Sequence, residues 1–148
     1  MPLTVKRITL WRREVENQPG VLATTLEPLA AAGADLRLVM GYRFPEETAR
    51  AAIELFPISG KKATAAAEAA GLTPFERPCL LVEGDDRPGF GADLGRGLAD
   101  AGLNIVFVVA QVVGRRFSAV VGLENDDAVA AATRAIKAAA KAAKARRR

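Results

Sequence analysis

Apolar side chains recur at two different spacings along the chain, and each change of spacing marks a new element. In residues 36–44 every second side chain is apolar, which is the period of a β-strand. Residues 21–30 place apolar side chains three and four positions apart, which is the period of an α-helix. Pro28 falls inside that helix, and Gly33 is placed to end it. In chain order, the first half is expected to form strand-like stretches over 5–15, a helix over 21–30, strands over 36–44 and 49–57, a helix over 61–70 and a short extended connector over 73–77.

The second half of the chain repeats this order. Pro19 and Pro88 are 69 residues apart, as are Gly33 and Gly102, so two copies of one supersecondary unit align here without a gap. The second copy is expected to form strands over 79–84, 103–113 and 117–124, a helix over 88–101, and a last helix that begins at 125–127. No strand follows that last helix. The second unit therefore either lacks its last strand or is completed by another segment of the chain.

Two such copies predict an α+β fold of tandem ferredoxin-like units, each with the order βαββαβ, an antiparallel sheet and helices on one face. The first unit is expected at residues 1–74 and the second at residues 75–148, which include a basic C-terminal tail. Units of about 70 residues bury a limited share of their surface, so we expect them to pack on each other or on a second chain.

The predicted strand at residues 103–113 is apolar on both faces. In the ferredoxin-like order this strand lies at the edge of its sheet, where an exposed apolar strand is prone to pair with another strand. We therefore expect edge pairing, either between the two units or between two chains. The residues expected on one face are Val106, Val108, Ala110 and Val112, and those on the other are Ile105, Phe107, Val109 and Val113.

Composition limits the class of protein. Half of the 148 residues are hydrophobic, which supports a real core. No run reaches the roughly 18 apolar residues of a membrane-spanning helix, and the N-terminus has no apolar signal segment. The single cysteine, Cys79, excludes an internal disulfide and fits a reducing compartment, so we expect a cytoplasmic protein.

The net charge of +4 arises at the end of the chain, because the rest of the sequence holds 15 basic and 17 acidic residues. The terminal cations complement the dipole of the last helix, or alternatively touch nucleic acid or an acidic partner. No aromatic side chain is interleaved with them for base stacking, which makes nucleic acid the less favoured partner. These cations are Lys137, Lys141, Lys144, Arg146, Arg147 and Arg148.

Each copy has an Asx-x-Pro-Gly segment between its first strand and first helix, at residues 17–20 and 86–89. A helix that opens there presents unpaired backbone amides to solvent, where a small anion can bind. The glycine permits a positive φ and a close approach of the ligand. The same segment is also a plain helix-entry signal, since proline suits the first helical position. Both interpretations stay open on these residues alone.

With these segments in place, the chain resembles the ACT domain in tandem, from residue 5 to about residue 137. The resemblance rests on a strand, Asx-x-Pro-Gly, a helix that ends in Ala-Gly-x-Asx-Ile/Leu, a strand hairpin and a second helix. It is strongest over residues 82–106, where residues 83–89 match the opening of the family. ACT domains pair through sheet edges and commonly bind an amino acid at the shared interface. The resemblance therefore implies a non-catalytic regulatory protein that is a homodimer.

The resemblance also implies a ligand site at each helix opening, together with the start of the following strand. We expect Asp86, which can only accept hydrogen bonds when ionised, to favour a ligand that bears an ammonium group. Binding of a small amino acid would then be signalled to a partner through the oligomeric interface. The implied ligand-binding residues are Asn17, Gln18, Gly20, Val21, Leu22 and Leu36 in the first unit and Asp86, Arg87, Gly89, Phe90, Gly91 and Ile105 in the second.

Side chains for catalysis are scarce. The chain has no histidine, so no Ser-His or Cys-His pair can be built, and the ligands for a zinc site are lacking. Cys79 lies in an apolar run, where a thiol is usually inert. Gly91 and Gly95 favour close helix packing over a phosphate loop. We expect no enzyme, no cofactor and no metal.

Two alternatives to an amino-acid-binding regulator stay open. They are a nucleic-acid-associated protein that uses the Lys/Arg tail, and a purely structural dimer with vestigial sites.

Overall fold

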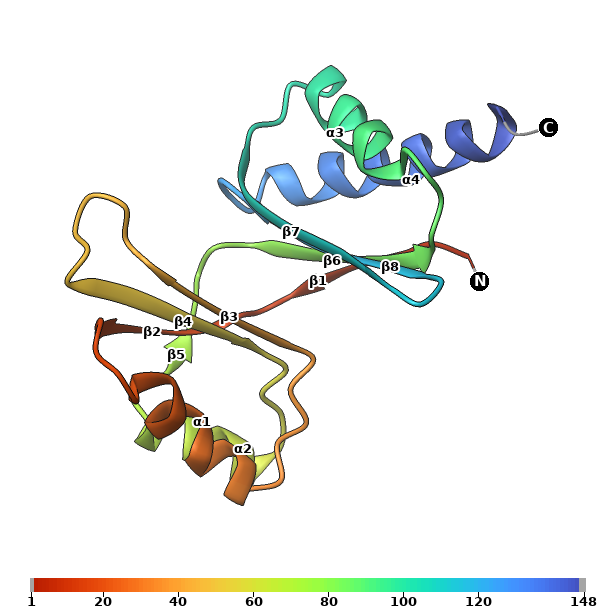
Figure 1. Cartoon of the computed structure of the whole chain (residues 1–148). Helices are drawn as coiled ribbons and strands as arrows, with labels where there is room; N and C mark the ends of the chain where they lie inside the picture. The colour runs from red at the N-terminus through yellow and green to blue at the C-terminus, as the bar shows by residue number, and fades with distance from the viewer. Residues whose placement is uncertain (1, 147–148) are drawn as a thin grey trace. The chain divides into compact units, whose positions relative to one another are not determined.

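The computed structural model describes residues 2–146, so Arg147 and Arg148 of the basic tail lie outside the described residues. The elements are coloured in chain order in Figure 1. They are β1 (Thr4–Ile8), β2 (Trp11–Glu16), α1 (Val21–Ala31), β3 (Leu38–Arg43), β4 (Arg50–Phe56), α2 (Lys61–Ala69), β5 (Thr73–Pro74), β6 (Cys79–Asp85), α3 (Phe90–Asp100), β7 (Ile105–Val113), β8 (Arg116–Leu123) and α4 (Ala128–Arg146).

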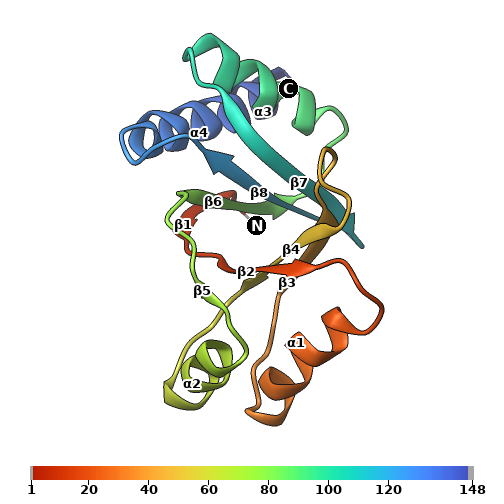
Figure 2. The same cartoon turned by 90° about the vertical axis from the view of Figure 1, so that its left-hand side faces the viewer.

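The chain forms two compact units, each with one sheet that carries two helices on one face (Figures 1 and 2). The N-terminal unit is Thr9–Glu76, and the C-terminal unit comprises the described residues before and after it. Strands follow the order β3-β4-β2-β5 in the first sheet and β1-β6-β8-β7 in the second. All pairs are antiparallel. The predicted α+β fold of tandem ferredoxin-like units is confirmed.

The last strand of the C-terminal unit comes from the start of the chain. β1 pairs with β6 in the position that a strand after α4 would otherwise fill. Leu3, directly before β1, packs closely on Gly84 of β6, where an added Cβ would lie 3.1 Å from Leu3 Cδ1 and 3.4 Å from its Cα. The observed units therefore differ from the predicted units, which were expected to divide between residues 74 and 75. The segment up to Ile8 belongs to the C-terminal unit, because it supplies the strand that pairs with β6.

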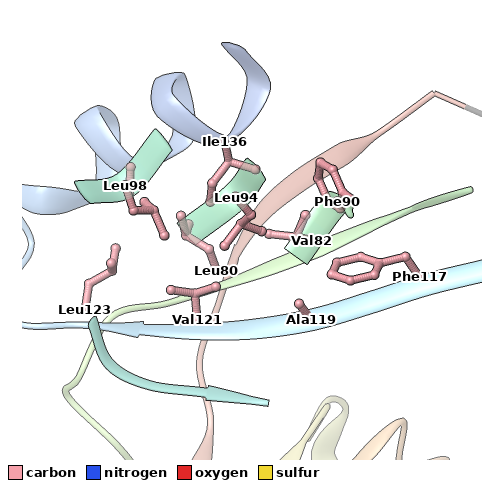
Figure 3. Close-up of a cluster of buried hydrophobic side chains, with 11 residues drawn as sticks. Leu80, Val82, Phe90, Leu94, Leu98, Phe117, Ala119, Val121, Leu123 and Ile136 are labelled. Carbon is pink, nitrogen blue, oxygen red and sulfur yellow. The ribbon is translucent and has the colours of Figure 1, made fainter. Parts of the chain in front are cut away.

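The C-terminal core lies between the sheet and the helices α3 and α4. In Figure 3, Leu94 and Leu98 of α3 and Ile136 of α4 point toward the side chains of β6 and β8. Phe90 meets Phe117 edge to face, with ring centroids 5.0 Å apart. The buried cluster comprises Leu80, Val82, Phe90, Leu94, Leu98, Phe117, Ala119, Val121, Leu123, Ala132 and Ile136.

The N-terminal core is smaller than the C-terminal one. In this unit Gly33 ends α1, as predicted from the sequence. Gly33 has a φ of 77°, and the Ala34 amide donates to the Leu29 carbonyl at 3.0 Å, which is the closing bond of a Schellman motif. Pro28 lies inside α1 without ending the helix. The buried cluster comprises Val15, Leu29, Ala51, Ile53, Leu55, Ala67 and Leu72.

Two expectations about local packing are wrong. A β-bulge between Ile105 and Phe107 turns Ile105 to the helix-covered face, so it does not share a face with Phe107. An added Cβ at Gly91 or Gly95 would meet nothing within 4 Å, so neither glycine is a site of close helix packing. That role belongs to Gly97, whose added Cβ would lie 3.2 Å from the Ala135 carbonyl oxygen of α4.

Candidate functional site

The two predicted helix openings have the same backbone geometry. Gly20 and Gly89 precede α1 and α3 with φ values of 89° and 86°, in the left-handed region that favours glycine. Neither helix has a side-chain hydrogen bond at its N-cap. An anion at either opening therefore does not have to displace a side chain of the protein.

Part of the first turn of each helix is already bonded. In α1 the Val21 amide donates to Gln18 and the Thr24 amide to Gly20, at 3.3 and 3.0 Å. In α3 the amides of Phe90 and Asp93 donate in the same way to Arg87 and Gly89. Among the described residues, this leaves two amides of each opening without a backbone acceptor. They belong to Leu22 and Ala23 in α1 and to Gly91 and Ala92 in α3.

The loop before α1 is held by its own polar groups. The Asn17 side-chain amide donates to the Thr48 carbonyl at 3.2 Å, and the Gln18 amide donates to the Glu16 carboxylate at 2.9 Å. Both bonds are exposed, and the Asn17 side-chain oxygen has no bond in the described chain. Leu22 is 45% exposed beside this loop. The opening of α1 thus offers an amide pair, a carbonyl acceptor and an apolar side chain.

The loop before α3 differs in its side chains. The Asp86 amide donates to the Arg115 carbonyl at 2.8 Å, while the Asp86 carboxylate is exposed and forms no bond in the described residues. Phe90 is only 4% exposed, so its ring belongs to the core and does not line a ligand site. Arg87 and Phe90 border a cavity of about 20 Å³, which has room for one water molecule.

The strand positions predicted to complete the sites are partly buried. Leu36 packs against the N-terminal core, and Ile105 packs against the C-terminal core, each within its own unit. The structure therefore keeps the helix openings accessible through the loops and the first helical turns. A contribution of Leu36 or Ile105 to the site of a neighbour stays a prediction.

Two polar clusters in the N-terminal unit were not predicted from the sequence. Thr25 of α1 is fully buried; its hydroxyl donates to the Val21 carbonyl and accepts from the Arg13 guanidinium, both at 2.8 Å. This pair ties β2 to the first turns of α1, directly behind its opening. The equivalent residues 69 positions later are Val82 and Leu94, which are apolar. The repeat therefore did not indicate the hydrogen bond between Arg13 and Thr25.

The second cluster lies in the N-terminal sheet around Arg12. Its guanidinium donates to Glu14 at 2.8 Å and lies 4.8 Å from the centroid of the Phe75 ring, a cation–π distance. Glu54, which is 1% exposed, lies opposite Arg12 in the strand pairing. Burial raises the pKa of Tyr42 against the opposing effect of Arg12, and Glu54 raises it further.

A groove of about 600 Å³ lies at the far end of α1 from its Pro-Gly loop. It runs between the C-terminal end of α1 and the start of α2, and it carries three cations and one carboxylate. The helix α2 also begins at a glycine, Gly60, without a side-chain cap. The charged residues that line the groove are Asp35, Arg37, Lys61 and Lys62.

Other classes of site have little support in the described part of the chain. No group of three or more metal-binding side chains gathers among residues 2–146. Cys79 is buried, as expected for an inert thiol. None of the helices described here has the length and apolar character needed to span a membrane.

Comparison with solved structures finds the same fold in several proteins, among them a regulatory subunit of an enzyme. The regulatory subunit of aspartate kinase from Thermus thermophilus matches with a TM-score of 0.61 at 17% identity, over 93% of this chain and 95% of that one. A protein from Bacteroides thetaiotaomicron matches with a TM-score of 0.71 at 16% identity, over 88% of each chain. The aspartate kinase of Clostridium acetobutylicum, an allosteric enzyme, matches with a TM-score of 0.58 at 15% identity, over 93% of this chain and 33% of that one.

No model of a known protein family matches the sequence, and no curated protein matches it. At identities below a fifth, these likenesses establish the fold. The chain has the tandem ACT fold that is found in the regulatory subunits of aspartate kinase.

Proposed function

We propose that this protein is a non-catalytic regulator that binds a small amino acid at the helix openings of its ACT-type units. The observation that carries the proposal is the pair of helices that begin at left-handed glycines with free amides and no side-chain cap. The shared fold with regulatory subunits, over nearly the whole chain, supports a regulatory role. Occupancy would be passed to a partner enzyme or regulator in the cytoplasm through an interface between identical chains.

The helix amides alone do not supply the affinity. A carboxylate at a helix start gains about 0.3–1 kcal/mol, or up to about 2 when partly buried, whereas micromolar affinity requires about 8 kcal/mol. Side chains that recognise the ammonium group and the side chain of the ligand must supply the rest. Asn17 provides a carbonyl acceptor in the first unit, and Asp86 provides an unbonded carboxylate in the second.

The two openings differ in the acceptors beside their free amides. The first turn of α1 has no acidic side chain, which favours the carboxylate of an amino acid. Asp93 lies in the first turn of α3 and Asp86 precedes it, so a carboxylate can accept from the ammonium group of a ligand whose own carboxylate meets the free amides of α3. We therefore propose that Asp86 favours a ligand that bears an ammonium group.

A thermal-shift screen of the proteinogenic amino acids tests the proposal. At millimolar concentration, at least one amino acid is expected to raise the melting temperature of the wild-type chain, because a ligand that binds only the folded state stabilises it. If none of them does, the proposal is wrong.

Calorimetry with the amino acid found in the screen then tests the role of Asp86. The variant Asp86→Ala is expected to weaken binding at the second unit by about tenfold, which corresponds to about 1.4 kcal/mol for a lost charge-assisted hydrogen bond. Asp127→Ala, which removes an exposed carboxylate elsewhere in the same unit, is the matched control and should bind as the wild type does. Unchanged affinity in Asp86→Ala would exclude the proposed selectivity.

A further inference from the structure

The opening of α1 has a pair of polar side chains behind it that the opening of α3 lacks. The hydroxyl of Thr25, which is fully buried, donates to the Val21 carbonyl and accepts from the Arg13 guanidinium, both at 2.8 Å. The same positions of the C-terminal unit hold Val82 and Leu94, which are buried. Since apolar side chains fill them there, the core of such a unit does not require a polar pair at this place.

The bond from the hydroxyl to the carbonyl is by itself ordinary for a threonine in a helix. Thr133 of α4 donates to the Val129 carbonyl at 2.8 Å in the same way, and within residues 2–146 no cation donates to its hydroxyl. At Thr25 the guanidinium donates to the hydroxyl oxygen as well. The cation of Arg13 is therefore what distinguishes the opening of α1.

Arg13 brings a permanent positive charge to this place. Its side chain is partly buried, and no carboxylate forms an ion pair with it in the described chain. It also lies against the glycine that follows α2, because an added Cβ at Gly71 would be 3.3 Å from the Arg13 Nε. A partly buried charge is screened less by salt than an exposed one. The guanidinium is thus a held cation, without a neutralising partner, beside the first turns of α1.

The two hydrogen bonds lead from this cation to a free amide of the opening. The Val21 carbonyl and the Leu22 amide belong to one peptide group, and this amide has no backbone acceptor in the part of the chain that is described. A hydrogen bond accepted by the carbonyl polarises the peptide group, so the amide becomes a stronger donor. In α3 the equivalent peptide group joins Phe90 and Gly91, and the side chain of Leu94 has no group that can donate to it.

From this arrangement we infer that the opening of α1 holds the carboxylate of the ligand and that Arg13 sets its preference for a negative charge. Arg13 acts through Thr25, so both are positioning residues. The opening of α3 offers free amides without this support and binds a carboxylate more weakly. This assignment rests on the proposed function, and it adds the unit and the residues that recognise the acidic end of the amino acid.

Acetate is the smallest probe of this assignment, and acetamide is its neutral counterpart. Both are titrated at constant ionic strength into the ¹⁵N-labelled full chain, and nuclear magnetic resonance follows the amides of the two openings. In the wild type, acetate is expected to shift the Leu22 amide with a dissociation constant about fivefold lower than that at Gly91. Acetamide should show no such preference. Equal affinity of acetate for both openings, or no shift at Leu22, overturns the assignment.

Two substitutions at Arg13 separate its charge from its hydrogen bond. Arg13→Lys and Arg13→Gln both keep a donor for Thr25, but only the first keeps the positive charge. Arg13→Lys should therefore retain most of the preference of acetate for α1, and Arg13→Gln should lose most of it. Arg43→Gln, which removes an exposed cation of the same unit, is the matched control and should bind acetate as the wild type does. If the two variants at Arg13 behave alike, its charge has no role and the assignment is wrong.

A double variant, Arg13→Val with Thr25→Leu, gives the N-terminal unit the apolar pair of the C-terminal one. It should bind acetate equally at both openings, and a preference for α1 that survives in it contradicts the role of the pair. Trp11 fluorescence shows whether the variant folds, since this side chain packs against the N-terminal core. Should it fail to fold, the two single substitutions at Arg13 decide alone.

Acetate also separates the assignment from the proposed function. Acetate that prefers α1, in a chain to which no amino acid binds, refutes the proposed function alone. An amino acid that binds only at the opening of α3, together with acetate that has no preference for α1, refutes the assignment alone.

Discussion

A chain that lacks residues 1–8 is expected to lose the fold of its C-terminal unit while the N-terminal unit stays folded. The reason is that β1 is the only partner of β6 on that side of the described sheet. Leu3 and Val5 also pack against the C-terminal core. Both side chains are partly buried, so each contributes less than the roughly 1.5–3 kcal/mol of a fully buried one, but a small domain is stable by only about 5–15 kcal/mol.

Hydrogen exchange measured by mass spectrometry distinguishes the two units in this truncated chain. Protection should fall throughout β6 and β8 and persist in β2 and β4, which pair within Thr9–Glu76. A second variant supplies the control: the deleted segment is joined by a flexible linker after the last residue, where the ferredoxin-like order has its closing strand. This variant should regain protection in β6. Unchanged protection in the truncated chain would show that β1 is dispensable.

Leu29→Ala should lower the free energy of unfolding of the N-terminal unit by about 2–5 kcal/mol. Leu29 is fully buried between α1 and the sheet, so the shorter side chain leaves a cavity and loses apolar contacts. Leu22→Ala removes the same atoms from the same helix, where the side chain is 45% exposed. We expect this control to change stability by less than about 1 kcal/mol.

Denaturant unfolding followed by Trp11 fluorescence measures both effects, since the single tryptophan packs against the N-terminal core. A small loss in Leu29→Ala would mean that α1 is not packed as described. An equal loss in both variants would mean that Leu22 is also part of a buried surface, as it would be in an assembled interface.

Local signals in the sequence were enough to predict the elements and the order of the fold. Gly33 and Gly102 fall at the same point of each copy, and both adopt the positive φ that ends a helix. The alternation in residues 36–44 and the helical spacing in residues 21–30 also correspond to β3 and α1, because each pattern reflects which face a residue buries.

Features that depend on distant partners were not predictable in this way. The strand-like residues 5–15 form two strands, β1 and β2, which separate at residues 9 and 10 and belong to different sheets. The partner of β1 is β6, which lies far away in sequence, so no local pattern marks the break. The bulge before Phe107 shifts the alternation of β7, and no residue type marks it. Gly95 and Gly97 look alike in sequence, and only the path of α4 decides which of them is crowded.

In the candidate site too, the features set by local sequence were predictable, and those set by distant partners were not. The glycine openings follow from the Pro-Gly pattern, which is local. That Phe90 is a core residue follows from its contact with Phe117, which lies on a strand that comes later in the chain. The Arg13–Thr25 pair joins a strand to a helix, and the hydrogen bond between them depends on their packing.

Nuclear magnetic resonance of the ¹⁵N-labelled chain, titrated with the amino acid found in the screen, tests the proposed receptor most directly. We expect the largest amide shifts at Leu22 and Ala23, at Gly91 and Ala92, or at both pairs, because these are the free amides of the helix openings. Binding that instead shifts the amides around Gly60, in the groove at the start of α2, and leaves both openings unchanged would contradict the proposed receptor.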